Sequence, residues 1–405
     1  MTPDPSPGLI APSQARNVPL DALRSFLVFL VVVHHAVLAY HPYAPPPQDS
    51  FTADSLMWTA FPIVDGHRWP GIDLLVGWND IFLMSIFFLL SGVFAWSSLM
   101  RKGSAGFLRS RALRLGLPFA VSAAVLAPLA YYPTYLVTGA DPGLGAFWSQ
   151  WLALGLWPSG PAWFLWVLLV FNAIAATLLV SIPGWGEALG RVTERLARRP
   201  LAYLGALVVV SGLAYLPLAA YFSPQFWGHL GPFWIQSSRA LHYAVYFFAG
   251  VGLGACGIGR GLLATDGKLA QHPLRWFFAA ITSFILAVAV FLAVMASLPQ
   301  GGPSPLLAAF GNFTFVLCCA CSCLACLAIF LRWSPSRSRA LTFFGSNAYG
   351  VYLAHYFCVS WLQLALLDLS LPGAVKGTLV IVGATLLSLG LSATLRRIPA
   401  VARVI

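Results

Sequence analysis

The chain has 405 residues, of which 59% are hydrophobic and 9% are charged, and its formal net charge is +11. Soluble domains average roughly 25% charged and 45–50% apolar residues, so this composition nearly excludes a soluble enzyme. If the basic residues formed one surface, they would suggest a nucleic-acid partner. If they lie between apolar runs, they indicate how the protein is oriented in a membrane.

Apolar runs of the length needed to span a bilayer, about 20 residues, follow one another along the chain. The runs are continuous, whereas the strands of membrane barrels alternate apolar and polar residues. The sequence therefore predicts an all-α integral membrane protein, a bundle of about ten transmembrane helices. The predicted spans are residues 20–40, 80–100, 112–137, 161–182, 201–221, 240–258, 275–298, 305–331, 341–368 and 374–396.

Arginine and lysine residues gather on one side of this predicted bundle. Nineteen of the 23 fall in the two tails and in every second connection, three fall in the opposite connections, and Arg24 lies inside the first span. Cytoplasmic loops carry the excess of basic residues, so both termini are expected in the cytoplasm. Because these residues are spread over short loops, no nucleic-acid partner is expected. The chain then divides into a cytoplasmic N-terminal tail (1–19), a transmembrane domain (20–396) and a cytoplasmic C-terminal tail (397–405).

The first span carries side chains that are costly inside a bilayer and therefore mark a candidate functional site. Arg24 and His35 are 11 residues apart, so they lie on one helix face, about 16 Å apart along the axis. Asp21 can pair with Arg24, whereas His34 is rotated by about 100° from His35. A histidine can act as general base for a hydroxyl at neutral pH. The alternative is a helix packed by hydrogen-bonded polar groups.

The longest connection expected outside the cell, residues 41–79, interleaves aromatic residues with carboxylates. Flat rings beside acids suit sugar binding, because the rings cover the apolar faces of a pyranose and the acids bind its hydroxyls. The alternative is an aromatic belt at the membrane interface. The tryptophans concerned are Trp58, Trp69 and Trp78.

Three arginines gather where the second and third spans meet the cytoplasm: Arg109, Arg111 and Arg114. A guanidinium fork matches phosphate, so this cluster could hold a phosphorylated cofactor. The alternative is a topology signal alone. In the second span, Ser91 begins a pair of small residues that favours close helix packing near mid-membrane.

A second histidine is predicted at the depth of His35. His355 lies 14 residues into the ninth span and His35 lies 15 residues into the first. Both helices are expected to run outward, so the two imidazoles could share a polar chamber. Tyr349, Tyr352 and Tyr356 form a stripe on the ninth span, a pattern that usually reflects packing.

Five of the seven cysteines fall within residues 318–326 of the eighth span. This span has no histidine or acid beside them, so we interpret them as small, buried and reduced core residues. The odd total disfavours a disulfide framework, and no metal site is expected.

Five segments, in this order, resemble the type 3 acyltransferase family of ten-helix bacterial membrane proteins. The most specific element is an arginine that is followed, after ten intervening residues, by a histidine. The resemblance spans about residues 19–360. Within the family, the sequence looks most like the glucans biosynthesis protein C branch, which succinylates periplasmic glucans. The segments are LDALRSFLVFLVVVHH, IFFLLSGVFAWSSLMRK, FLRSRALRLGLPF, PAWFLWVLLVF and SNAYGVYLAHYF.

The resemblance implies a multi-pass enzyme of the bacterial inner membrane. It would transfer an acetyl or succinyl group from cytoplasmic acyl-CoA to a hydroxyl of a cell-envelope carbohydrate. His35 would take the proton from the acceptor or first accept the acyl group itself, with Arg24 and Asp21 as its catalytic partners. Both routes stay open, and so does the oligomeric state.

The same resemblance implies where the substrates bind. The three clustered arginines and Ser91 would hold acyl-CoA, and the acceptor would lie against Tyr352, His355, Asn79 and Trp163. A transporter or flippase for a glycan or polyprenyl-linked substrate is the alternative. The spans hold few acids and no internal repeat, which disfavours it.

Overall fold

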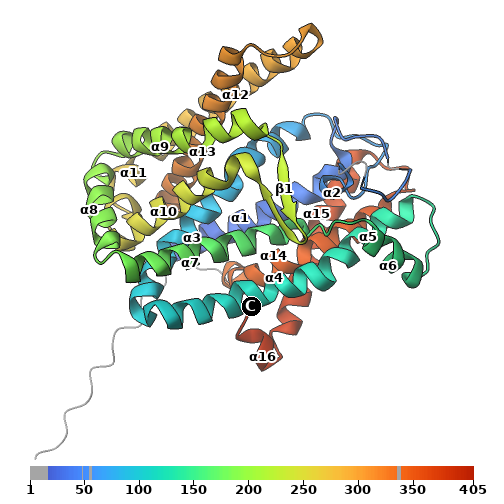
Figure 1. Ribbon diagram of the computed structural model, residues 1–405, viewed down its shortest axis with the longest axis horizontal. Coiled ribbons are helices and arrows are strands. Elements are labelled where there is room, and N and C mark those ends of the chain that lie inside the picture. Colours follow the sequence, from blue (N-terminus) through green and yellow to red (C-terminus); the bar gives the residue numbers. More distant parts are fainter. Residues whose placement is uncertain (1–16, 48, 54–56, 335–338) are drawn as a thin grey trace, which may run out of the picture.

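The computed structural model describes residues 17–47, 49–53, 57–334 and 339–405. Helices make up most of these residues, with one short antiparallel hairpin (Figure 1). The longer helices are α1 (Val18–Val37), α3 (Ile72–Arg111), α5 (Ala127–Val137), α6 (Leu144–Ala153), α7 (Trp163–Ser181), α8 (Trp185–Ala197), α9 (Pro200–Phe222), α10 (Ala240–Cys256), α12 (Pro273–Ser297), α13 (Pro305–Trp333), α14 (Arg339–Leu366) and α15 (Gly373–Leu395). The short elements are α2 (Met57–Ala60), α4 (Leu117–Val121), α11 (Lys268–Gln271), α16 (Pro399–Ala402), β1 (Trp227–Leu230) and β2 (Phe233–Gln236).

The architecture is that of an all-α, multi-pass membrane protein. Each predicted span consists of helical residues, apart from one or two residues at some ends. In the described part of the chain, seven helical segments are long and apolar enough to cross a membrane, or eight with the bent pair Ser237–Cys256 and Gly261–Gln271. Ten spans and cytoplasmic termini stay predictions. One of the seven segments, Ile72–Val137, contains two of the predicted spans.

The predicted connection between the second and third spans is not a loop. Helical residues continue through it, and the backbone leaves helical geometry at Gly103, where φ is 66° and ψ is 168°. Glycine adopts positive φ at little cost because it has no Cβ, so one residue is enough to separate two helical segments here. Beyond it, α3 runs without interruption into two π-helical turns, η2 (Ala112–Gly116) and η3 (Ser122–Leu126), which flank α4. The arginine cluster therefore lies on the continuous helical segment that forms the third span.

Close helix packing holds the centre of the bundle together. Gly92 of α3 and Gly250 of α10 face the partner helix, and a Cβ at either position would overlap a backbone carbonyl of the other helix. Small residues allow membrane helices to approach in this way. The prediction of a close-packing position beside Ser91 is confirmed.

Helix α1 occupies an interior position, because it contacts α3, α13, α14 and α15. It begins at a capped turn, in which the Asn17 side chain accepts a hydrogen bond of 3.1 Å from the Leu20 backbone N–H. Asp21 in the first turn suits the positive end of the helix dipole.

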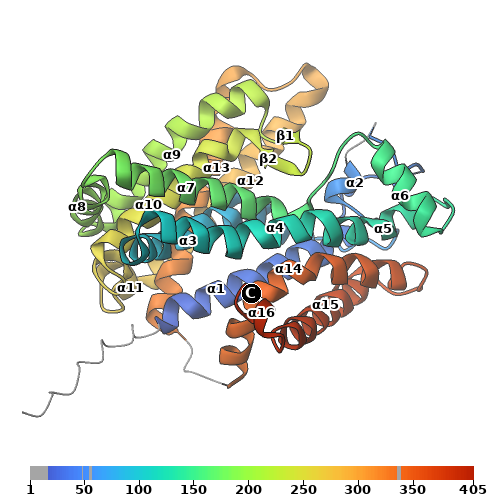
Figure 2. The same ribbon diagram turned by 60° about the horizontal axis from the view of Figure 1, so that its bottom comes forward.

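The connections that contain α8 and α11 lie at one end of the bundle, and α2 and α6 lie at the other (Figures 1 and 2).

Candidate active site

Two histidines from helices far apart in sequence meet inside the bundle. His35 near the end of α1 and His355 of α14 have ring centroids 5.0 Å apart. The Nδ1 atom of His35 lies 3.3 Å from the Nε2 atom of His355, and His355 is buried. The structure thus brings together the two histidines that the sequence places at similar depth.

Backbone carbonyls define the proton positions on both rings. Nδ1 of His35 lies 2.9 Å from the Val31 carbonyl oxygen, and Nδ1 of His355 lies 2.6 Å from the Tyr352 carbonyl oxygen. A carbonyl oxygen only accepts, so each Nδ1 carries the proton in the neutral pair. Nε2 of His355 then accepts from His35, and the lone pair on Nε2 of His35 is left available to take a proton.

Gln363 is a site residue that the sequence analysis missed. Its amide nitrogen donates to the carbonyl oxygens of His35 and Ala36, at 3.1 Å each, and the side chain is 2% exposed. The last carbonyls of a helix have no partner within the helix, so Gln363 caps the end of α1 that carries His35. The sequence feature that could have identified Gln363 is its amide side chain, which lies in the apolar ninth span, eight residues after His355.

Arg24 and Asp21 lie at the opposite end of α1. The predicted pairing is present, with Arg24 Nη1 4.0 Å from Asp21 Oδ1. The Arg24 guanidinium also lies over the ring of Phe94 in α3, 5.3 Å from its centroid. Ser91 is one helical turn before Phe94, and therefore on nearly the same face of α3. Neither Arg24 nor Asp21 belongs to the histidine pair.

A basic groove of about 460 Å³ lies beside the third span. Arg109 and Arg114 line it, and they are joined by Arg403 of the C-terminal segment. Arg111 does not line this groove, because its guanidinium lies over the ring of Phe107, 4.9 Å from the centroid. Helical spacing explains the difference, since Arg111 is four residues from Phe107 and shares its face. Arg403 could not be placed from the sequence, because a tail arginine has no periodic pattern to tie it to a distant helix.

A row of rings connects this groove to the histidine pair. Tyr349 of α14 donates a hydrogen bond to the Arg114 carbonyl oxygen in η2. The rings of Tyr349 and Tyr352 are parallel, with centroids 6.5 Å apart, and Tyr352 lies 5.9 Å from His355. The stripe predicted as packing therefore runs from the arginines to the histidines.

Asn79 and Trp163 are not joined to the histidine pair by any contact in the described residues. Asn79 is buried in α3, and neither its side-chain oxygen nor its nitrogen has a hydrogen-bond partner within the described part. Trp163 packs against Trp227 of the hairpin and Tyr243 of α10, with ring centroids 5.4 and 5.7 Å apart. The sequence pattern did not anticipate this hairpin.

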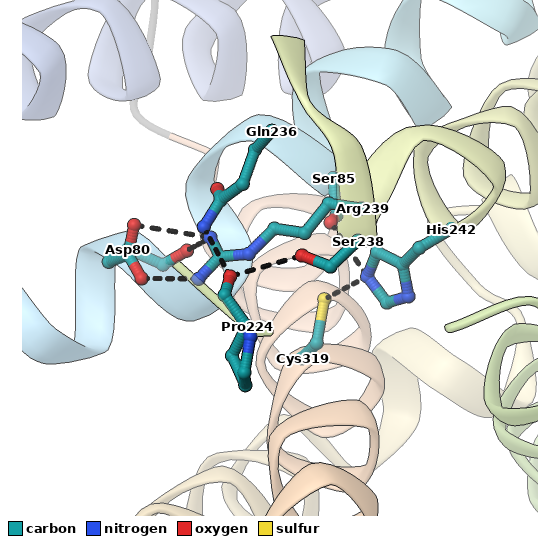
Figure 3. Close-up of polar contacts among 8 residues, drawn as sticks. All are labelled: Asp80, Ser85, Pro224, Gln236, Ser238, Arg239, His242 and Cys319. Atoms are coloured by element: carbon teal, nitrogen blue, oxygen red, sulfur yellow. Dashed lines mark hydrogen bonds and ion pairs between the residues drawn. The ribbon is translucent and has the colours of Figure 1, made fainter. Parts of the chain in front are cut away.

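A second polar cluster, buried except for Asp80, joins α3, α10 and α13 (Figure 3), and Ser211 extends it to α9. Arg239 binds both carboxylate oxygens of Asp80, at 2.6 and 3.1 Å, and its side chain is 7% exposed. His242 lies 3.2 Å from Ser85 Oγ, and its other nitrogen lies 2.7 Å from Ser211 Oγ. These contacts hold α10 in place against its neighbours, at a position separate from the histidine pair.

The three basic residues on the less basic side all make internal contacts. Arg239 pairs with Asp80, Lys376 Nζ lies 2.7 Å from Asp65 Oδ2, and Arg68 Nη1 donates to the His41 carbonyl oxygen at 3.3 Å. Each exception to the charge asymmetry is therefore explained by a specific partner, and none needs to act as a topology signal.

The tryptophans of the first long connection pack inside the protein. Trp58 is buried against Phe51 and Tyr131. Trp78 Nε1 donates to Ser322 Oγ at 3.0 Å, and the ring of Trp69 packs on α15, where it covers Gly377. For Trp58, the prediction of sugar binding and the alternative of an aromatic belt at the membrane interface are both wrong, because its ring has no exposed face.

The cysteines of α13 are core residues, as the sequence indicates. Cys318, Cys319, Cys321, Cys323 and Cys326 are buried, and all seven cysteines are free thiols. Within the described ranges, no group of three or more His, Cys, Asp or Glu side chains could hold a metal ion.

No curated protein and no solved structure matches the chain. The likeness to the glucans biosynthesis protein C branch therefore stays a prediction. A family model does match: the acyltransferase domain of the type 3 family aligns with residues 17–397, most of the chain. Together with the apolar helices, this match shows that the chain belongs to the type 3 acyltransferase family of membrane proteins.

Proposed function

We propose that the protein transfers an acyl group from acyl-CoA to a hydroxyl of a cell-envelope carbohydrate, and that it works in a bacterial inner membrane. Family membership supports acyl transfer. The donor, the acceptor and the residue roles are proposals. The observation that carries them is the row of Tyr349 and Tyr352 that connects a basic groove to the paired histidines.

The groove suits the phosphates of coenzyme A. Three of its six lining residues are arginines, Arg109, Arg114 and Arg403, and none is acidic. Guanidinium groups bind phosphate oxygens through paired, charge-assisted hydrogen bonds. At the predicted cytoplasmic end, this groove would meet acyl-CoA where the cell makes it.

The tyrosine row gives the pantetheine arm a route inward. The parallel rings of Tyr349 and Tyr352 lie along one side of α14, and His355 continues the same side. A thin, flexible arm that follows these rings brings its thioester to the histidine pair. Arg24, at the other end of α1 from His35, would accompany the arm near its entrance.

The histidine pair can carry out the proton transfers of the reaction. Nε2 of His35 takes the proton from the acceptor hydroxyl as that oxygen attacks the thioester carbonyl. The C–O bond forms, the C–S bond breaks, and the proton passes to the departing CoA thiolate. Nε2 of His355 accepts the Nδ1–H of His35 and stabilises the charged imidazole between these steps. In the alternative route, Nε2 of His35 attacks the thioester carbonyl and the C–S bond breaks, so that CoA leaves as its thiolate. The hydroxyl then attacks the acyl-imidazole, the C–N bond breaks, and the hydroxyl proton passes to the thiolate.

Donor cleavage by the purified protein tests this proposal. The protein in proteoliposomes is given radiolabelled acetyl-CoA, with and without a short oligosaccharide, and released CoA and labelled sugar are measured. We expect labelled ester on the sugar, and its loss after mild alkali. If the protein neither binds nor cleaves any acyl-CoA, the proposed donor is wrong. An acyl ester on a lipid but not on a sugar would overturn the acceptor alone.

A further inference from the structure

Helix α3 has an open face inside the bundle. Between Phe82 and Trp96, only four residues are not buried, and they follow one another at intervals of three or four residues. Residues with this spacing lie on one side of a helix. They are Met84, Phe87, Ser91 and Phe94. The exposed Asp80 extends the same line by one turn, and we call these five residues the open face of α3.

This open face points into the bundle. At one end, the guanidinium of Arg24 in α1 lies over the ring of Phe94. Further along, the ring of Phe87 lies 5.8 Å from that of Phe164 in α7, and the ring of Phe164 lies 6.1 Å from that of Tyr352. The exposed surface of α3 therefore lies between α1, α7 and the tyrosine row of α14.

The packing of α1 against α3 places Asp80 close to the depth of His35. The two helices run in opposite directions, because the connection that leads into α3 is bonded to the end of α1: the Trp69 backbone N–H donates to the Tyr40 carbonyl oxygen at 2.7 Å. Measured from the contact of Arg24 with Phe94, His35 is 11 residues along α1 and Asp80 is 14 residues along α3. At about 1.5 Å per residue, these are roughly 16 and 21 Å, so Asp80 lies about one turn beyond His35.

A second observation also places Asp80 near the histidine pair. Its carboxylate and the imidazole of His34 are close enough to interact electrostatically. The rings of His34 and His35 lie 5.2 Å apart, and neither histidine is fully buried. The polar cluster around His242 is separate from the histidine pair, but its exposed member, Asp80, lies on the side that faces the pair.

Arg239 fixes the Asp80 carboxylate and leaves part of it open (Figure 3). Arg239 bonds to both carboxylate oxygens and donates to the Asp80 backbone carbonyl oxygen at 2.7 Å. The arginine side chain is 7% exposed, whereas that of Asp80 is 55% exposed. An ionised carboxylate only accepts hydrogen bonds and offers about four lone-pair sites. Because Arg239 already neutralises the charge, the remaining sites suit a neutral donor, such as the hydroxyl of a sugar, better than a cation.

We propose that Asp80 binds the acceptor, by accepting a hydrogen bond from a second hydroxyl of the carbohydrate while the first hydroxyl reacts at His35. This inference rests on the proposed function. It makes Asp80 the residue that distinguishes a polyol from water, because only a polyol reaches both groups at once. A site that binds a hydroxyl discriminates against acceptors without one, since its polar group is then left unpaired.

The test measures transfer of radiolabelled acetyl from acetyl-CoA to a short oligosaccharide in proteoliposomes, with the two substrates varied separately. Asp80→Asn should raise KM for the sugar about 10–100-fold, because a hydrogen bond to a charged group is lost. KM for acetyl-CoA should be nearly unchanged. The ratio of free labelled acetate to labelled sugar ester should rise by a similar factor, and this ratio does not depend on how much protein is folded.

Two further variants separate acceptor binding from a structural role. Asp80→Glu keeps a charge for Arg239 but moves the carboxylate by one methylene, so it should also raise KM for the sugar. Ser85→Ala removes a contact of the same polar cluster, but Ser85 is 1% exposed and lies off the open face. Both of its KM values should therefore equal those of the parent.

The outcomes distinguish this inference from the proposed function. A normal KM for the sugar in Asp80→Asn, or an equal rise in Ser85→Ala, would overturn the assignment of Asp80 and leave the proposed function standing. If the parent protein forms no sugar ester from acetyl-CoA or any other acyl-CoA, both are wrong.

Discussion

Nδ1 of His35 lies 3.3 Å from Nε2 of His355, and no such contact joins His355 to the adjacent His34 in the described structure. Removal of a general base typically lowers a rate about 10²–10⁴-fold. His35→Ala should therefore lose transfer by at least that factor, because it removes the Nε2 lone pair that takes the proton in the proposed mechanism. His34→Ala should keep most of its activity.

The comparison of these two variants is made with inserted, folded protein. Acyl-CoA binding and thermal unfolding should be nearly unchanged in His35→Ala, since the basic groove lies at the other end of the tyrosine row. Robust turnover by His35→Ala would remove the basis of the proposed mechanism. Equal losses in both variants would point instead to packing around α1.

Acidification should lower activity. His35 must be neutral to accept a proton, so protonation of its ring removes the base. We expect kcat/KM to fall at the acidic end of the profile and to be level at higher pH. A pH-rate profile on the parent and on His355→Gln measures this. His355→Gln should lower the plateau, because the partner that stabilises charged His35 is altered. A profile that stays flat down to the lowest pH at which the protein remains folded would exclude His35 as the base.

The helices and the position of His35 could be predicted from the sequence because they depend on local periodicity. Apolar runs of bilayer length define the spans, and 11 residues place Arg24 and His35 on one face. The depth match between His35 and His355 also follows from counting residues along two helices of the same direction. These arguments need only helix geometry.

The rest of the candidate site depends on tertiary contacts that no period reveals. Gln363 caps the end of another helix, and Arg403 lines a groove whose other residues are far from it in sequence. The different position of Arg111 follows from its helical spacing to Phe107, but that spacing applies only because the predicted connection is helical. Lys376 was counted as an outward charge, although it is buried in an ion pair.

Reporter fusions test the predicted topology. The connection at Arg198 belongs to the basic side, and Pro142 lies in the connection between α5 and α6 at the other end of the bundle. A fusion at Arg198 should report the cytoplasm, and one at Pro142 should report the outside. The same location for both would refute the arrangement, and a reversed pair would place the basic groove away from cytoplasmic acyl-CoA.

The groove arginines should differ from Arg111 in their effect on donor binding. Arg114→Ala and Arg403→Ala should raise KM for acyl-CoA by about 10–100-fold, because each removes a charge-assisted hydrogen bond worth roughly 1.5–3 kcal/mol. Their kcat should change little. Arg111→Ala should have a smaller effect on KM, since that side chain lies over Phe107.

Salt provides the control for the arginine variants. Exposed charges are screened at high ionic strength, so binding by the parent should weaken with salt, and the two groove variants should respond less. Dephospho-CoA derivatives should lose less affinity than CoA derivatives when a groove arginine is removed. Normal KM and normal salt response in Arg114→Ala and Arg403→Ala would show that these residues only orient the protein in the membrane.

The buried pair of Lys376 and Asp65 should stabilise the packing of the first long connection on α15. Their side chains are 0% and 2% exposed, and Lys376 also donates to the Leu367 carbonyl oxygen at 2.9 Å. Removal of one partner from a buried ion pair typically costs about 3–5 kcal/mol, because the other charge is left without compensation. Lys376→Met should therefore lower the unfolding temperature markedly, and Asp65→Asn should do so as well.

The double variant separates pairing from the individual side chains. With both charges removed, neither is left buried alone, so the double variant should be more stable than Lys376→Met. The coupling energy in a double-mutant cycle should then exceed about 1 kcal/mol. This pair anchors the connection that carries Thr59, whose carbonyl oxygen accepts from Tyr356 beside His35. Each single variant should consequently lose part of its turnover even at low temperature, whereas additive stability effects would show that the two residues act independently.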